Sequence, residues 1–489
     1  MSPAMTDVAF WPALKLIRAL RARKLGALEL LELYAARIER YDPKLNALCV
    51  LDLDAARKRA RAFDRASVRK GARQPLLAGL PMTVKESFDL AGHPTTWGLE
   101  QQRGNVARRN ALAVERLLAA GANVFGKSNV PVMLADWETN NPVYGKTVNP
   151  WDASRTPGGS SGGAAAALAA GLTALELGSD IGGSIRNPAH YCGVYGHKPT
   201  WGICSMQGHA LPGMAHPADI SAIGPLARGA ADLELALSVV AGADAIDGAG
   251  WKLALPAPRR SSLRGLRAAV LATHPTAETD RSVQDAIERL AGSLSRKGAR
   301  VSARALPAFD LGEAHRVFIQ LLRGATSGRQ TPEQFAGMLA ARAEVGRDDD
   351  SYYAQMVRAN TQPHKDWLAA SNRRHQMRLA WSEFFRDWDV LLCPNAASAA
   401  FPHSMPGERW ERMITVNGAA QPATTQMWWA GMAGMCYLPA TAAPIGLSPE
   451  GLPLSVQIVG PQHGDLSTIR VAQLIERELY AFVPPPGVE

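Results

Sequence analysis

Hydrophobic positions in the first seventy residues recur every three or four residues, with polar and charged positions between them. Leu28, Leu31, Leu33 and Ile38 lie close to this spacing, which places them on one face of a helix. The pattern therefore predicts that residues 1–70 form an N-terminal helical region.

After this region, short apolar runs begin to alternate with helical stretches. One of the predicted helices, at residues 163–172, consists of alanine, glycine and leucine alone, so we expect it to be buried. Such alternation predicts an α/β domain whose sheet is largely buried. The predicted strands are at 80–90, 123–127 and 173–180, and the predicted helices are at 110–121 and 163–172.

From about residue 240 the helical pattern becomes amphipathic, with charged side chains along one side. Two such helices are predicted at 281–301 and 372–392. We find no internal repeat and no linker long enough to separate domains. Further strands are predicted at 266–272, 301–307, 388–394 and 451–461.

The composition is that of a globular protein with a substantial core. The chain has 489 residues, of which 47% are hydrophobic and 20% charged, and its formal net charge is +9. Basic residues gather at 18–24 and 56–73, where a nucleic-acid surface is one interpretation. Phe63 is the one aromatic residue among them, whereas a stacking surface needs several. A solvated helix face is therefore favoured, and no nucleic-acid partner is expected.

Neither a disulfide framework nor a metal site is expected. The five cysteines are scattered and contain no CxxC pair. The chain start lacks a basic segment followed by an apolar run, so no signal peptide is expected, and we predict a cytoplasmic location. The uncharged segment Met413–Pro449 is interrupted by three prolines. We interpret it as protein interior, and no membrane association is expected.

Three short motifs match known catalytic patterns but lack the context that each requires. Gly121–Ser128 matches the phosphate-binding GxxxxGK[ST], yet a helix precedes its first glycine and a strand fills its middle, the reverse of the required order. Gly158–Gly162 matches GxSxG with Ser160 as nucleophile, but a polar loop, not a strand, leads into it. Ser67–Lys70 matches SxxK in a basic, exposed stretch, where the lysine would remain charged.

A more coherent set consists of one lysine and two glycine–serine turns. Lys85 lies in an apolar strand, where desolvation favours the neutral form that can accept a proton from a serine hydroxyl. Ser160 lies in "GGSSGG", and Ser184 follows Gly182 and Gly183. Successive glycines allow backbone N–H groups to converge on one point, as an oxyanion hole requires. Each feature alone could be structural, but together they indicate Ser–Lys catalysis without histidine.

At this point the sequence resembles the amidase signature family over nearly its whole length. The resemblance rests on "PGGSSGGAAAALAAG", "GSDIGGSIRNPAHYCGVYGHKPTWG", "IGPLAR", "LPMTVKESFDLAG" and "GLPLSVQIVGP". It implies one large domain, 1–489, with a mixed central sheet covered by helices on both faces. Within it, the expected parts are the helical region 1–70, a catalytic core 71–235, a more variable region 236–390, and a C-terminal part 391–489 that completes the sheet and the substrate pocket.

The same resemblance assigns roles to individual residues. It implies Ser184 as the nucleophile, Ser160 as a proton relay whose bond to Gly159 is cis, and Lys85 as the terminal base. The remaining implied roles are an oxyanion hole made by the N–H groups of Ile181, Gly182, Gly183 and Ser184, and support from Ser161, Asp180 and Arg186. Glu86 stands where many relatives carry Asp, which we interpret as a subgroup difference.

The implied function is hydrolysis of small amides through an acyl-enzyme, with no cofactor and no metal. We expect a hydrophobic or aryl substrate, carbamates or esters as further substrates, and a monomer or homodimer. The glutamine amidase subunit of a tRNA-dependent amidotransferase is the alternative, and a non-catalytic or partner-dependent scaffold is another. The candidate substrate-pocket residues are Met206, His209, Met214, Cys393, Asn395, Trp428, Trp429 and Met432, although the tryptophan and methionine stretch could equally belong to the core.

Overall fold

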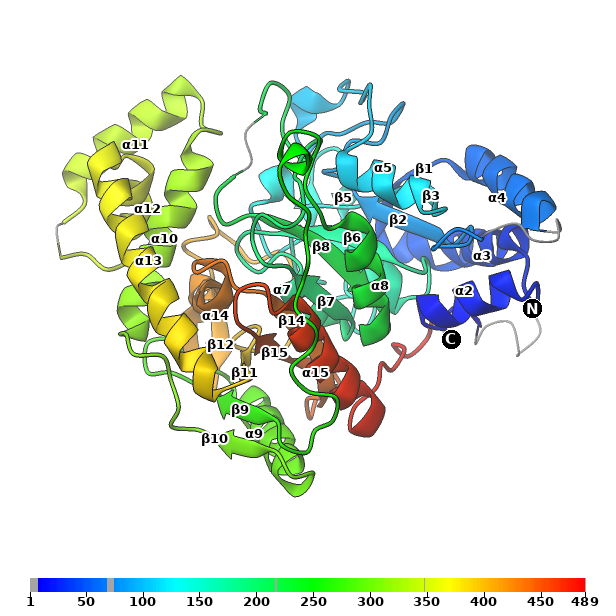
Figure 1. Cartoon of the computed structure of the whole chain (residues 1–489). Coiled ribbons are helices and arrows are strands. Elements are labelled where there is room, and N and C mark those ends of the chain that lie inside the picture. Colours follow the sequence, from blue (N-terminus) through cyan, green and yellow to red (C-terminus); the bar gives the residue numbers. More distant parts are fainter. Residues whose placement is uncertain (1–7, 68–73, 216–217, 347, 489) are drawn as a thin grey trace.

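The computed structural model describes residues 8–67, 74–215, 218–346 and 348–488 (Figure 1). An 11-stranded sheet runs through the molecule. Parallel pairs, such as β2–β3 and β2–β6, alternate with antiparallel pairs, such as β6–β8 and β14–β15, so the sheet is mixed. In spatial order the strands are β1 (Leu48–Leu51), β3 (Asn123–Ser128), β2 (Pro81–Lys85), β6 (Glu176–Asp180), β8 (Ala222–Ala227), β7 (Tyr195–Lys198), β14 (Ala440–Leu447), β15 (Pro453–Val459), β11 (Val390–Pro394), β9 (Arg267–Val270) and β10 (Arg300–Ser302).

Helices cover both faces of this sheet. Helices α6 (Gly162–Ala169) and α7 (Arg186–Cys192) pack on each other, and α7 lies on β7, β14 and β15. Helices α8 (Ala230–Val240) and α15 (Asp465–Glu478) also pack on each other, against β8 and β14 respectively (Figure 1). The fold is therefore the predicted α/β domain with a mixed sheet.

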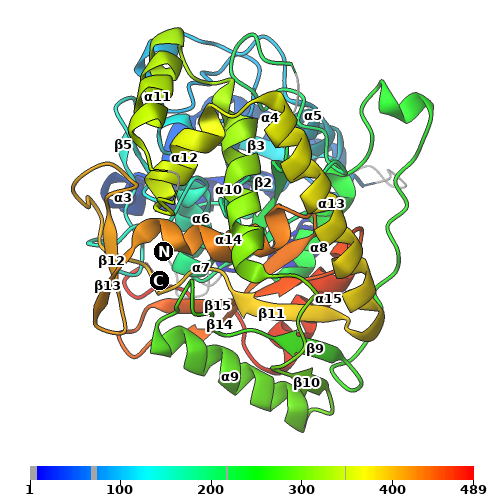
Figure 2. The same ribbon diagram turned by 90° about the vertical axis from the view of Figure 1, so that its left-hand side faces the viewer.

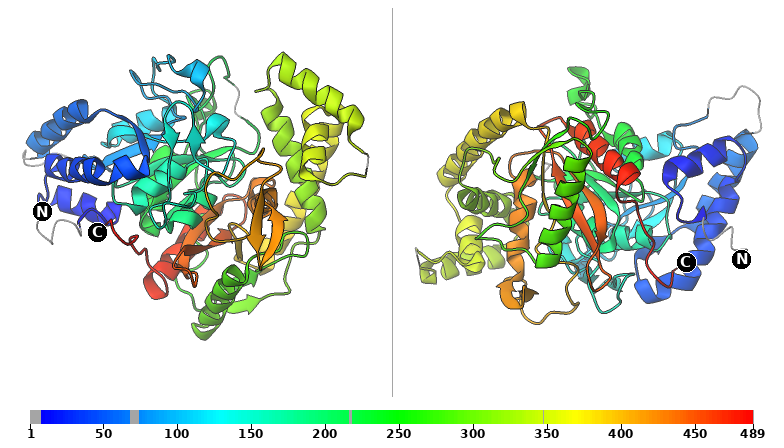
Figure 3. Two further views of the ribbon diagram at one scale, coloured as in Figure 1. Left: turned by 180° about the vertical axis from the view of Figure 1, so that it is seen from behind. Right: turned by 90° about the horizontal axis from the view of Figure 1, so that it is seen from below.

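Most of the other helices gather at the two ends of the sheet, whereas α9 packs on β10, β11, β14 and β15, and α5 packs on α8. The N-terminal helices lie beyond β1 and β3, and α10 to α13 form a separate group on the far side of the molecule (Figures 1 and 3). Figure 2 shows α14 between that group and the sheet. Their bounds are α2 (Ala13–Arg21), α3 (Ala27–Leu45), α4 (Leu53–Ser67), α5 (Leu112–Ala119), α9 (Arg281–Arg296), α10 (Leu311–Ser327), α11 (Pro332–Glu344), α12 (Tyr352–Asn360), α13 (His364–Asp387) and α14 (Gln426–Gly434).

The alanine-rich helix α6 is buried along its whole length, as predicted. Its second residue shows why small side chains are required there. A Cβ on Gly163 would lie 2.4 Å from the backbone nitrogen of Asn129 and 2.5 Å from the carbonyl oxygen of Ala47. The helix can approach the loop after β3 this closely only because that position is glycine.

The structure corrects two predictions. The described part of the predicted helical region, residues 8–67, contains strand β1 between its helices, a four-residue edge segment too short to interrupt the apolar periodicity. Part of Met413–Pro449 is not interior, because the hairpin of β12 (Met413–Val416) and β13 (Ala419–Pro422) leaves Met413 49% exposed. The rest of the segment, α14 and β14, is largely buried.

One of the discarded motifs can be compared with the structure in full. Gly121–Ser128 consists of the turn after α5 and the buried strand β3, and the Lys127 ammonium group donates hydrogen bonds to Pro94 and Thr95. This is not the strand–loop–helix order of a phosphate-binding loop. Of the motif Ser67–Lys70, the last three residues lie outside the described residues. Among the residues described, no helix is long and apolar enough to cross a membrane.

Candidate active site

Lys85 ends strand β2 in the middle of the sheet, between β3 and β6, and its side chain is fully buried. Its ammonium nitrogen Nζ lies 2.7 Å from the hydroxyl oxygen of Ser160 and 3.0 Å from that of Ser179, and 3.4 Å from the carbonyl oxygen of Ser179. These hydroxyl and carbonyl oxygens are few partners to stabilise a positive charge that is buried at the end of an apolar strand.

Burial lowers the pKa of Lys85 from its ordinary value to about 7, although the charges of Asp180 and Glu176 act in the opposite direction. Desolvation disfavours the charged ammonium more than these carboxyl groups restore it. A large fraction of Lys85 is therefore neutral near pH 7, and neutral lysine can accept a proton from a hydroxyl group.

Ser160 lies in a glycine turn that is pressed against a neighbouring loop. The Gly159–Ser160 peptide bond is cis, and Gly158 has a φ of +85°. A Cβ on Gly159 would lie 2.2 Å from the carbonyl oxygen of Asp136, so glycine is required for this close approach. The turn is anchored by the Thr139 hydroxyl, which donates a 2.7 Å hydrogen bond to the carbonyl of Gly158. These contacts direct the Ser160 hydroxyl towards Lys85.

Ser161 joins this turn to the second glycine–serine turn. Its backbone N–H donates to the carbonyl of Ser184 at 3.1 Å, and its hydroxyl donates to the carbonyl of Ser179 at 3.4 Å. Ser184 itself is 5% exposed and lies between β6 and α7. Hydrogen bonds thus connect Lys85 to Ser160 directly and to Ser161 through the Ser179 carbonyl, and Ser161 bonds the backbone of Ser184.

The second turn is built around the buried carboxylate of Asp180. Its oxygens accept hydrogen bonds from the N–H groups of Gly183 at 2.9 Å and Ile185 at 3.0 Å, and from the Arg186 guanidinium at 2.8 and 3.0 Å. Burial would raise the pKa of Asp180, but the charge and hydrogen bonds of Arg186 outweigh burial and hold it below its ordinary value. The carboxylate therefore stays charged and shapes the turn.

This arrangement bears on the predicted oxyanion hole. Of its four amides, that of Gly183 already donates to Asp180. Gly183 has a φ of +99°, a backbone conformation that glycine adopts readily because it has no Cβ atom to clash. The contribution of Ile181, Gly182 and Ser184 stays a prediction.

Two apolar elements border this turn: a loop that the sequence did not single out, and α14, which contains the predicted tryptophan and methionine stretch. The indole nitrogen of Trp137 donates a 3.2 Å hydrogen bond to the carbonyl of Gly182. A Cβ on Gly183 would lie 3.1 Å from both Trp137 and Ala430, and one on Gly182 would lie 3.6 Å from Met427. Trp137 belongs to a loop, and the other two belong to α14. No local sequence pattern marks these contacts, because they are made only through tertiary packing.

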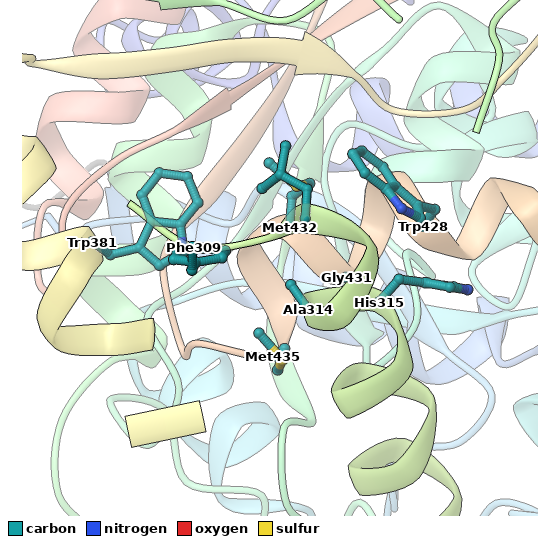
Figure 4. A pocket seen from close by; sticks show the side chains of 9 residues that line it. Phe309, Ala314, His315, Trp381, Trp428, Gly431, Met432 and Met435 are labelled. Carbon is teal, nitrogen blue, oxygen red and sulfur yellow. The ribbon is translucent and has the colours of Figure 1, made fainter. Parts of the chain in front are cut away.

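The structure places Trp428, Trp429 and Met432 in the interior between α14, α10 and α13. Trp428 and Met432 line a small cavity together with His315 and Trp381 (Figure 4). Its volume of about 10 Å³ for the centre of a water molecule leaves room for about one water. In this conformation the cavity does not hold an amide substrate, so a role of these residues in binding stays a prediction.

The remaining predicted pocket residues divide into two groups. Cys393 and Asn395 are buried at β11 and brace β15, because Gln457 donates to the Cys393 sulfur at 3.3 Å and Asn395 donates to Ser455 at 2.7 Å. Met206, His209 and Met214 lie in one loop, where Met206 is partly buried and Met214 is 39% exposed.

His209 is the member of the loop that reaches the catalytic cluster. Its Nε2 lies 3.0 Å from the Ser87 hydroxyl, two residues after Lys85, and its ring lies 4.6 Å from that of Phe88. Burial, followed by the nearby charge of Lys85, lowers the pKa of His209 to about 3. The imidazole is therefore neutral at physiological pH.

No group of three or more metal-ligating side chains occurs among the described residues. The groups that the site brings together are a buried lysine, two serine hydroxyls and a glycine turn.

Comparison with known proteins gives consistent results over almost the full chain. The family model named Amidase matches residues 29–469. An indoleacetamide hydrolase of Bradyrhizobium diazoefficiens is 32% identical over 477 residues, covering 95% of this chain and 86% of that protein. A glutamyl-tRNA(Gln) amidotransferase subunit of Anaeromyxobacter sp. strain K is 33% identical over 488 residues, covering 95% of each.

Among solved structures, one described as a vestigial protein complex that reveals the origins of an s-triazine catabolic enzyme superposes with a TM-score of 0.78. Its sequence identity is 28%, and the match covers 96% of this chain and 99% of the other.

Proposed function

This chain belongs to the amidase signature family and is an enzyme that hydrolyses amides, and we propose that its substrates are small hydrophobic or aryl amides cleaved through a Ser184 acyl-enzyme. The observation that carries the proposal is the 2.7 Å contact between the Lys85 ammonium nitrogen and the Ser160 hydroxyl, made in a fully buried setting that favours neutral lysine.

In the proposed reaction, neutral Lys85 takes the proton of Ser160 while Ser160 takes that of Ser184. The Ser184 oxygen attacks the amide carbonyl, and the negative charge that develops on the carbonyl oxygen is stabilised by N–H groups of the glycine turn. The same relay then delivers the proton to the leaving nitrogen, which leaves an ester on Ser184. Water enters, loses a proton to the relay and attacks the ester carbonyl; the bond to the Ser184 oxygen then breaks, the relay returns the proton to that oxygen, and the acid is released.

The preference for apolar or aryl groups is supported by the residues that border the turn. Trp137, Met427 and Ala430 present apolar surface within contact distance of Gly182 and Gly183. Burying apolar substrate atoms against such surface lowers the free energy of binding. The similarity to an indoleacetamide hydrolase, a protein named for an aryl amide, agrees with this preference. Carbamates and esters with aryl groups would be cleaved by the same steps.

Active-site labelling tests the nucleophile. We expect a fluorophosphonate to modify Ser184, with the adduct absent in Ser184→Ala and formed at least tenfold more slowly in Lys85→Ala. Ser238→Ala is the control, since it removes an exposed hydroxyl of helix α8 that donates to the carbonyl of Leu235 in the same helix. Modification of Ser160 in place of Ser184, located by mass spectrometry of the digested protein, would contradict the mechanism.

The alternative is the glutamine amidase subunit of a tRNA-dependent amidotransferase, favoured by 33% identity over 95% of both chains. That role requires partner subunits and glutamine. A panel containing glutamine, indole-3-acetamide, acetanilide and malonamide separates the two. Turnover of the aryl amides by the isolated chain supports the stand-alone amidase, whereas glutamine or malonamide as the best substrate contradicts it.

A further inference from the structure

We propose that Arg329, Trp97 and His209 form a subsite for a carboxylate carried by the substrate, so that the amides this enzyme prefers are anionic. The inference deepens the proposed function and rests on it, because it adds a charged group to a small aryl or apolar amide. The three residues lie outside the motifs that the family resemblance rests on.

Arg329 follows helix α10 and holds a cation with no carboxylate beside it. Its guanidinium lies over the indole ring of Trp97, 5.1 Å from the ring centroid. Among the described residues, no salt bridge pairs Arg329 with an aspartate or glutamate. The Arg329 side chain is partly buried, and this burial lowers its pKa. A cation in this position gains from an anionic partner that the protein does not supply.

Trp97 and His209 add two polar atoms that lack partners. Trp97 is 2% exposed and His209 is 5% exposed, and their rings lie 5.3 Å apart. The indole Nε1 of Trp97 and the Nδ1 of His209 are both buried and have no hydrogen-bond partner in the described structure. Buried polar atoms are normally paired, so such atoms next to a lone guanidinium indicate a missing ligand group.

This cluster is connected to the catalytic lysine through short contacts. The backbone N–H of Trp97 donates to Glu86, the residue after Lys85, at 2.9 Å, and His209 bonds Ser87 at 3.0 Å. The charges of both Lys85 and Arg329 reach His209 and lower its pKa. Trp97 and His209 of the proposed anion site are therefore each one hydrogen bond away from the two residues that follow Lys85 in the chain.

The chemistry favours a carboxylate. A guanidinium binds a carboxylate through two parallel N–H···O bonds, and the indole N–H is a further single donor. His209 is neutral, so it contributes one N–H or one lone pair and no charge. One cation with one or two neutral donors matches the single charge of a carboxylate, whereas a phosphate dianion needs more positive charge.

The test compares anilides with and without a carboxylate group. 4-Acetamidobenzoate and acetanilide form one pair, with the carboxylate on the leaving amine. Glutaranilate and hexananilide form the other, with the carboxylate on the acyl side. Binding is measured by calorimetry in the Ser184→Ala variant, where no turnover occurs. We expect at least one anionic probe to bind at least tenfold more tightly than its neutral partner.

Variants then locate the interaction. Arg329→Gln is expected to remove this advantage, Arg329→Lys to retain part of it, and Trp97→Phe to reduce it about threefold through loss of the N–H. Arg316→Gln removes an exposed charge from helix α10 and is expected to change nothing. Circular dichroism establishes that each variant is folded.

Two results would overturn the subsite. One is that neither anionic probe binds more tightly than its neutral partner, and the other is that Arg329→Gln and Arg316→Gln weaken binding equally. Turnover of the neutral anilides by the wild-type enzyme reports separately on the proposed function. The subsite and the amidase mechanism can therefore fail independently.

Discussion

At the scale of single residues, the site depends on how Lys85 is surrounded. Two hydroxyl groups and one carbonyl lie within 3.4 Å of its Nζ, and the side chain is fully buried. A hydroxyl can either donate to neutral lysine or accept from the ammonium ion, so the Ser160 contact persists in both protonation states. The lysine can therefore exchange a proton with Ser160 without moving.

The depressed pKa of Lys85 predicts how activity depends on pH. Because the neutral amine is the base, kcat/KM for an anilide should rise as pH increases through about 7 and then level off. Below that pH Lys85 is protonated and cannot accept the Ser160 proton. The measurement is kcat/KM between pH 5 and 9.5, with circular dichroism recorded at each pH.

Lys198 provides a matched control for this prediction. Its pKa is also lowered to about 7, chiefly by burial, but its Nζ donates to the carbonyl of Pro199. In Lys198→Met the rise near pH 7 should remain, whereas Lys85→Met should lose it together with most of the activity. A wild-type profile that falls above neutral pH, in protein that is still folded, would argue against Lys85 as the base.

At the scale of elements, the sequence predicted the strands that carry the chemistry and also β9, β10, β11 and β15 in the second half of the sheet, and it missed β1, β7, β8 and β14. Strands β2, β3 and β6 are apolar runs bounded by turn residues, which sequence patterns detect well. Strand β14, with the sequence ATAAPIGL, was not assigned because alanine and proline are poor strand formers. Helices α10 to α12 also went unassigned, although their lengths suffice for a periodic pattern.

Prediction from local sequence patterns was limited in the same way for the residues of the site. The glycine–serine turns and Lys85 were identifiable because each has a local pattern. Trp137 and Arg329 were not, since they lie in a loop and in the turn after α10, and their neighbours are set by tertiary packing. Side chains that act through tertiary contacts leave no periodic or motif signal.

Helix α6 gives a prediction at this scale. Gly163→Ala should lower the free energy of unfolding by about 3 kcal/mol, because the new methyl would meet backbone atoms of Asn129 and Ala47 that cannot rotate away. Gly337→Ala, within α11 and with no atom within 4 Å of the new methyl, should instead stabilise by about 0.5 kcal/mol through helix propensity. Urea denaturation measures both, and equal effects would disprove the packing argument.

At the scale of the whole molecule, one buried guanidinium joins parts of the chain that are far apart in sequence. Arg186 forms a two-point contact with Asp180, donates to the carbonyl of Ala430 in α14 at 2.9 Å, and bonds Gln457 of β15. Gln457 in turn donates to the carbonyls of Pro394 and Trp429. The Ser184 turn, α14 and the second half of the sheet therefore share one hydrogen-bond network.

This network predicts that Arg186→Gln affects stability and activity together. Removing the guanidinium leaves the buried Asp180 carboxylate without its counter-charge, which should cost about 3–5 kcal/mol of unfolding free energy. It should also loosen the turn that positions Ser184 and lower kcat/KM. The double variant Asp180→Asn/Arg186→Gln should lose less stability than the single variant, because it contains no unpaired buried charge. Arg386→Gln, in an ion pair that is more than two-thirds exposed, should change little.

The pH dependence of the stability lost in Arg186→Gln identifies the cause of this loss. Without Arg186, burial dominates and raises the pKa of Asp180, so the carboxyl group of the folded variant takes up a proton as pH falls. Protonation removes the unpaired charge, and the stability difference between wild type and Arg186→Gln should therefore be larger at pH 8 than at pH 5. Chemical denaturation at the two pH values measures this difference. A deficit that does not change with pH would mean that Arg186 acts through packing and neutral hydrogen bonds, and not by compensating the charge of Asp180.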